Sequence, residues 1–259
     1  MYEDILNVIY NYAFSNKLPD DKFIDTILNI VVDDAIAGYI MNVDYDYQSL
    51  SLASYAYERR MLRFNADMIA LQYINLYPAY MYNRNKIFLD KSLFICLGVI
   101  EVIFHELEHV LQSKKINILP EDDFERKLLE IGTIAVDVYP GLYENNHDLF
   151  SIEREANINS SKKIKNILAL DDLSSNRIKR FFNNRYNKLL NEYYSKTNYP
   201  LLKFLTTVQG KLAYGDIPII SDNTEMILEE TKKNLSFDER VLWGLPLDKG
   251  EQRKLRKVK

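Results

Sequence analysis

Two histidines stand four residues apart in the segment His105-Glu106-Leu107-Glu108-His109. On an α-helix, residues i and i+4 lie one above the other on the same face, so the two imidazoles can bind one metal ion together. Glu106 lies on the flank of that face, poorly placed as a ligand but close enough to accept a proton from a water molecule that the ion holds. The segment therefore predicts metal-assisted hydrolysis.

This pattern is improbable by chance. The chain has 259 residues, of which three are histidine and 17 are glutamate. Such a composition yields roughly 0.002 expected matches to His-Glu-x-x-His. Two of the three histidines are used in this one arrangement, which favours a metal site over a helix with unrelated surface histidines.

A catalytic zinc ion usually takes three protein ligands and leaves its fourth position for water, so a third ligand must come from another segment. Cys96 is the one cysteine, which excludes cysteine-based zinc sites and leaves an oxygen ligand or the remaining histidine. The downstream candidates are Glu153, Glu155, His147 and Asp137. Residues two apart on a helix point about 200° away from each other, so only one of the two glutamates can face the metal.

The segments 105–109 and 151–157 together resemble the gluzincin group of zinc metallopeptidases. In that group a second helix supplies a glutamate ligand, and an Asp or Asn four residues later braces a ligand histidine. The resemblance thus implies Glu153 as the third metal ligand and gives the bracing role to Asn157, where many relatives carry Asp. It covers about residues 52–170 and looks most like the small intracellular peptidases of phages and mobile elements.

The motif and the resemblance predict a hydrolase: a zinc-dependent metallopeptidase acting on a protein or peptide substrate. Zinc lowers the pKa of its bound water toward about 7, and Glu106 would accept that water's proton and later deliver it to the leaving amine. The oxyanion would be stabilised by His147, if it is not a ligand, or by one of Tyr139, Tyr143, Tyr186, Tyr193 and Tyr194. The alternative is a zincin-fold binding or regulatory protein of a mobile element with little turnover, against which the retained Glu106 argues.

The elements that must position these residues are mostly helical. With eight glycines and seven prolines, the chain has few breakpoints, and long stretches show helical spacing. We expect an α+β fold: a mostly helical zincin-like fold with a small antiparallel sheet beside the motif helix. The predicted parts are N-terminal helices over 1–43, a metallopeptidase core over 44–170 and a helical C-terminal extension over 171–259. The predicted helices cover residues 3–15, 20–37, 92–114, 121–137, 147 or 151 to 167, 174–196, 199–213 and 222–235.

Two stretches predict strands. Residues 62–68 alternate between apolar and polar side chains, the period of a half-buried strand, and 86–89 form a second short candidate. In zincin-type enzymes an exposed strand edge commonly binds an extended substrate. The stretch 62–68 is therefore either such an edge or an interior strand with no substrate role.

Two residues near the motif have simpler interpretations. Cys96 lies in the apolar run 93–100 and is expected to pack in the core. Glu101 stands one turn before His105, where it is a candidate hydrogen-bond partner of the metal ligands or a group that faces the cleft or solvent.

Composition and charge restrict the partners. The net charge of −4 conceals −12 over residues 1–158 and +8 over residues 159–259. A DNA-associated regulator that uses the basic half is therefore a second alternative to the peptidase. It is the less favoured one, because the chain has no Gly-rich phosphate loop, zinc finger or aromatic RNA-binding signature. The N-terminus lacks a secretory signal and no apolar run reaches the roughly 20 residues of a membrane span. We therefore expect a cytoplasmic protein without a membrane partner.

Overall fold

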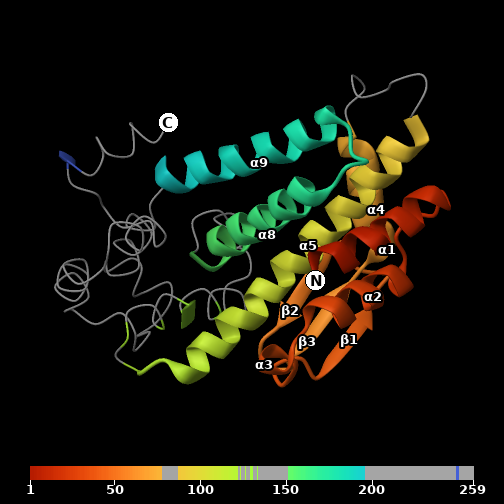
Figure 1. The fold of residues 1–259 in the computed structure, drawn as a ribbon. Helices are drawn as coiled ribbons and strands as arrows, with labels where there is room; N and C mark the ends of the chain where they lie inside the picture. The colour runs from red at the N-terminus through yellow and green to blue at the C-terminus, as the bar shows by residue number, and fades with distance from the viewer. Residues whose placement is uncertain are drawn as a thin grey trace. The chain divides into compact units, whose positions relative to one another are not determined.

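The computed structural model of the chain describes residues 1–77, 87–121, 123, 126, 129, 130, 133, 151–195, 249 and 250. The chain forms two compact units: one comprises residues 1–114 and 156–187, and the other comprises 115–155 and 188–259. Most of the described residues are helical, and a small sheet accompanies them (Figure 1). The predicted α+β, mostly helical class is thus confirmed.

The N-terminal segment forms three helices: α1 (Tyr2–Phe14), α2 (Asp21–Val31) and α3 (Asp34–Ala37). The side chain of Asp20 caps α2 by accepting a hydrogen bond from the backbone N–H of Phe23 at 3.0 Å. The single helix predicted over 20–37 is wrong near its C-terminal end, where Asp33 begins a new helix by accepting hydrogen bonds from two backbone N–H groups of its first turn.

The sheet has the strand order β1-β3-β2, with β1 (Asn42–Tyr45) parallel and β2 (Ala53–Ala56) antiparallel to β3 (Met61–Phe64). The predicted antiparallel sheet is therefore a mixed one. Because β3 is the middle strand, it offers no edge to a substrate, and among the described strands the edges are β1 and β2.

The predicted strand over 62–68 ends early, at Phe64. Asn65 starts α4 (Ala66–Leu76) by accepting a hydrogen bond from the backbone N–H of Met68 at 3.0 Å. An Asn cap at this position converts the alternating pattern into the first turn of a helix.

The motif lies on the long helix α5 (Ile87–Ile118), which extends beyond the predicted range 92–114 at both ends. Residues 87–89 belong to this helix, so the second predicted strand is wrong there, and Lys86 lies outside the described residues. The core packs around α5, and its members on this helix include Leu93, Phe94, Cys96, Leu97, Val99, Ile100, Ile103, Phe104, Leu107 and Val110.

Two further helices, α8 (Ser151–Leu170) and α9 (Asn176–Ser195), confirm the predictions for these stretches. The first unit contains α8 from Ala156 onward and α9 up to Asn187. Figure 1 shows α8 and α9 as two neighbouring helices beside α5. Of the helix predicted over 121–137, the described residues Arg126, Leu129, Glu130 and Thr133 are helical, whereas Glu121 and Asp123 at its predicted start are not. The helices predicted over 199–213 and 222–235 lie outside the described residues.

Within the described part of the chain, no helix is both long and apolar enough to span a bilayer.

Candidate metal centre

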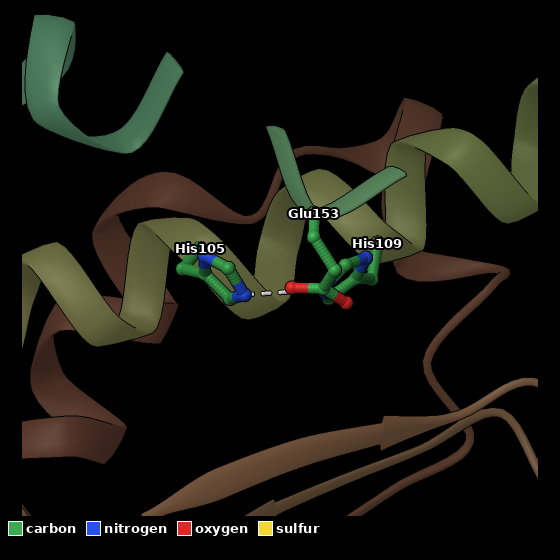
Figure 2. A group of neighbouring side chains, drawn as sticks. All are labelled: His105, His109 and Glu153. Carbon is green, nitrogen blue, oxygen red and sulfur yellow. Dashed lines mark hydrogen bonds between the residues drawn. The ribbon is translucent and has the colours of Figure 1, made fainter. Parts of the chain in front are cut away.

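The structure brings His105, His109 and Glu153 together. One side-chain nitrogen of each histidine and one carboxylate oxygen of Glu153 all lie within 4.8 Å of one another. Figure 2 shows the carboxylate of Glu153 directed toward the two imidazole rings. The two histidines come from successive turns of α5, and Glu153 comes from the first turn of α8.

The two imidazoles face each other with the spacing that a shared metal requires. Nε2 of His109 lies 3.2 Å from Nε2 of His105, and the rings are nearly perpendicular, at 83°. Two nitrogens bound to one tetrahedral zinc ion at about 2.0–2.1 Å lie roughly 3.3 Å apart. The donor set of two imidazole nitrogens and one carboxylate oxygen is also that of catalytic zinc sites. The residues present thus fit a zinc ion.

Glu153 lies on a buried face of α8. The side chain of Glu153 is only 3% exposed, and the small Ala156 one turn later is fully buried. Residues three apart on a helix share a face, so this face of α8 is buried where it carries Glu153.

The alternative third ligands divide into two groups. The carboxylate of Glu155 forms an ion pair with Nζ of Lys115 at 3.1 Å, so it serves a different contact from that of Glu153. His147 and Asp137 lie outside the described residues. Among the described candidates, Glu153 is the one near the histidines.

Glu106, the predicted proton acceptor, follows His105 directly on α5 and is buried. A buried carboxylate keeps its electrostatic effect, because little water screens it. Its position on the motif helix is fixed by the same backbone that carries both histidines.

Gln112, which lies outside the motif and was not among the predicted site residues, contacts His109. Its Oε1 atom lies 2.8 Å from Nδ1 of His109, and its side chain is 1% exposed. The described contact at Nδ1 of His109 is with Gln112, and the bracing role that the resemblance gave to Asn157 stays a prediction. Asn157 is only half-buried, and its backbone carbonyl accepts from the hydroxyl of Ser160. The i, i+3 spacing from His109 was the signal in the sequence that could have identified Gln112.

Tyr57 is a second neighbour that the sequence did not reveal. Tyr57 directly follows the edge strand β2, and its ring centroid lies 6.5 Å from that of His109. Of the tyrosines predicted for the oxyanion, Tyr186 packs under Nζ of Lys165, 5.0 Å from its ring centroid. Tyr139 and Tyr143 lie outside the described residues, as do the side chains of Tyr193 and Tyr194.

Buried ion pairs hold the neighbouring helices against α5. Glu108, inside the motif, forms an ion pair with Lys163 and accepts a hydrogen bond from Nδ2 of Asn159 at 2.9 Å. Both partners belong to α8. Because three polar groups satisfy one another across this contact, it defines how α8 aligns with the motif helix.

Glu101 belongs to a separate buried cluster. Its carboxylate accepts from the hydroxyl of Tyr73 at 2.8 Å and pairs with Nε of Arg185 at 2.9 Å. Burial, reinforced by Glu101, raises the pKa of Tyr73 well above its usual value. Glu101 thus links α4 and α9 to α5, which makes it a packing residue of the fold.

Comparisons of the chain with protein-family models, with curated proteins and with solved structures gave no match.

Proposed function

We propose that the chain is a zinc-dependent metallopeptidase in which His105, His109 and Glu153 hold the metal and Glu106 is the general base. One observation carries this proposal: three donors of the types that zinc prefers lie within 4.8 Å of one another. Glu106 lies between the two histidines in the sequence of α5, and this position extends the proposal from metal binding to hydrolysis.

When bound, a zinc ion supplies the Lewis acidity that activates water and polarises the scissile carbonyl. Glu106 accepts the proton that water loses as its oxygen bonds to the carbonyl carbon. The same carboxyl group then donates this proton to the amine nitrogen as the C–N bond breaks, so the residue ends each cycle as a carboxylate. Burial of Glu106 favours both transfers, because it keeps competing solvent water from the proton.

An extended peptide fits the layout of the described sheet. The strand β2 is an edge, and Tyr57, which follows it, lies beside His109. A peptide that pairs with the backbone of β2 would therefore be led toward the metal ligands, and alternate side chains would select its sequence. This assigns substrate binding to β2 in place of the stretch 62–68.

The test combines metal content with cleavage of a peptide library read by mass spectrometry. The purified wild type is expected to hold about one zinc per chain and to cleave a subset of peptides. Glu106→Gln keeps the shape of the side chain but cannot accept a proton, so it should retain zinc and lose cleavage by at least about 10²-fold.

A matched control is Glu3→Gln, which makes the same change on the exposed surface of α1 and should leave both readouts unchanged. Cleavage by Glu106→Gln at the wild-type rate would contradict the role of Glu106. A wild type that binds zinc but cleaves no peptide or protein would instead support the alternative, a binding or regulatory protein.

A further inference from the structure

The two nitrogens of His109 have different surroundings. Nδ1 lies 2.8 Å from the amide oxygen of Gln112, whereas Nε2 lies 3.2 Å from Nε2 of His105, on the side where Glu153 approaches. The Gln112 side chain is almost completely buried, so water does not compete for the contact.

An amide oxygen can only accept a hydrogen bond. The contact with Gln112 therefore requires a hydrogen on Nδ1 of His109. A neutral imidazole carries one hydrogen, so Nε2 is left with its lone pair directed into the site. This is the form in which an imidazole binds a metal ion.

From this geometry we infer that Gln112 is a positioning residue, which holds His109 in the Nδ1–H tautomer and so presents Nε2 as a metal ligand. The inference rests on the proposed metal site, and it names a residue that the motif does not contain. Gln112 lies one turn beyond His109 on the same helix, so the backbone of α5 sets the distance between the two side chains.

The chemical type of residue 112 also suits the charge of the site. Glu106 and Glu153 are both buried, and their two carboxylates together would balance the charge of a divalent cation. A carboxylate at residue 112 would add a further buried charge, whereas a neutral amide orients the ring without one. Gln112 thus fixes the tautomer and leaves the net charge of the loaded site unchanged.

The tautomer can be measured directly in the metal-free protein. The chain has three histidines, so long-range ¹H–¹⁵N correlation spectra at about pH 8 contain three imidazole patterns, which His147→Gln and His105→Gln variants assign. We expect the Nδ1–H pattern for His109 in the wild type and its loss in Gln112→Leu. Gln112→Glu, which keeps an acceptor of the same length, should retain the pattern.

Zinc affinity, measured by competition with a chelating dye, gives the second readout. Gln112→Leu should weaken zinc binding by about 10- to 100-fold, as for other partners of metal-ligating histidines. Gln112→Glu should stay within about tenfold of the wild type. Ser92→Ala removes a different buried polar group from α5 and should change neither readout.

A wild-type His109 protonated at Nε2 would overturn the inference, as would a Gln112→Leu variant with an unchanged tautomer and unchanged zinc affinity. If Gln112→Leu does not fold, the wild-type tautomer and that of Gln112→Glu still decide. One further result separates the two claims. If the wild type shows the expected tautomers but binds no zinc, the proposed function is overturned, while the orienting contact of Gln112 is established.

Discussion

A Cβ atom placed on Gly98 would lie 2.1 Å from Cδ1 of Tyr73, so the tyrosine ring fills the space that a side chain at residue 98 would need. The ring belongs to α4 and the glycine to α5, one turn before Glu101. Because this glycine admits the ring, the Tyr73 hydroxyl can reach the Glu101 carboxylate at 2.8 Å.

Gly98→Ala should therefore destabilise the protein by about 1–3 kcal/mol, the usual cost of overpacking a core. The helix propensity of alanine acts in the opposite direction by only about 1 kcal/mol. Urea unfolding measures the difference. Gly38→Ala is the matched control, because a Cβ there meets no atom within 4 Å and should cost little. Equal stability of the two variants would contradict the packing argument.

The two glutamates of α8 should behave differently toward zinc. Glu153→Ala removes a proposed ligand and is expected to lower zinc affinity by more than about 100-fold. Glu155→Ala removes the ion pair with Lys115 and should leave the zinc content near that of the wild type. Metal analysis after dialysis measures both. Full zinc content in Glu153→Ala would show that the assignment of the third ligand is wrong.

The contact between Glu108 and Lys163 should contribute to stability as a pair. Lys163→Met leaves a buried carboxylate with Asn159 as its described partner and should cost about 1–3 kcal/mol. Adding Glu108→Leu removes the buried charge, so the double variant should be less destabilised than the sum of the single variants, with a coupling of about 0.5–3 kcal/mol. Thermal or urea unfolding of the four proteins gives this coupling, and strict additivity would contradict it.

Low pH should destabilise the segment that joins α8 to α9, because this segment contains the buried carboxylate of Asp171. Burial alone would raise the pKa of Asp171, but hydrogen bonds donated by Ser174, Tyr10 and Leu173 outweigh it and hold that pKa below its usual value. A carboxyl group with a lowered folded-state pKa stabilises the fold above its unfolded-state pKa of about 3.9, and this contribution is lost as the pH falls through the folded-state pKa.

Asp171→Asn should thus cost about 1–2 kcal/mol at pH 7, and the difference from the wild type should shrink toward pH 2. Urea unfolding at both pH values measures this. The exposed neighbour provides a control: Asp172→Asn should change stability by less than about 0.5 kcal/mol at pH 7. A constant difference between Asp171→Asn and the wild type across this pH range would argue against the carboxylate as the cause.

Cys96 should be chemically inert in the folded protein. It lies fully buried in α5, and burial raises the pKa of its thiol to about 12. A buried thiol with so little thiolate does not react with disulfide reagents. Titration with such a reagent at pH 8 should detect no thiol in the native protein and one after unfolding in guanidinium. Rapid reaction of the native protein would place Cys96 at the surface.

The sequence by itself determined the residues that local spacing brings together. His105 and His109 share a helix face wherever that helix forms, because the period of 3.6 residues decides it. The same local rules predicted helices from 147 or 151 to 167 and over 174–196, which the structure has over 151–170 and 176–195. They also predicted a buried Cys96, since an apolar helix face must pack in the core.

Only the tertiary structure decided which distant groups meet. No period in the sequence states that Glu153 approaches the histidines while Glu155 turns to Lys115, or that Tyr57 lies beside His109. Likewise, alternation at 62–68 could not tell a middle strand from an edge, nor foresee that Asn65 would cap a helix. Such contacts depend on how whole elements pack, because burial and polar pairing are satisfied between segments that the chain separates by tens of residues.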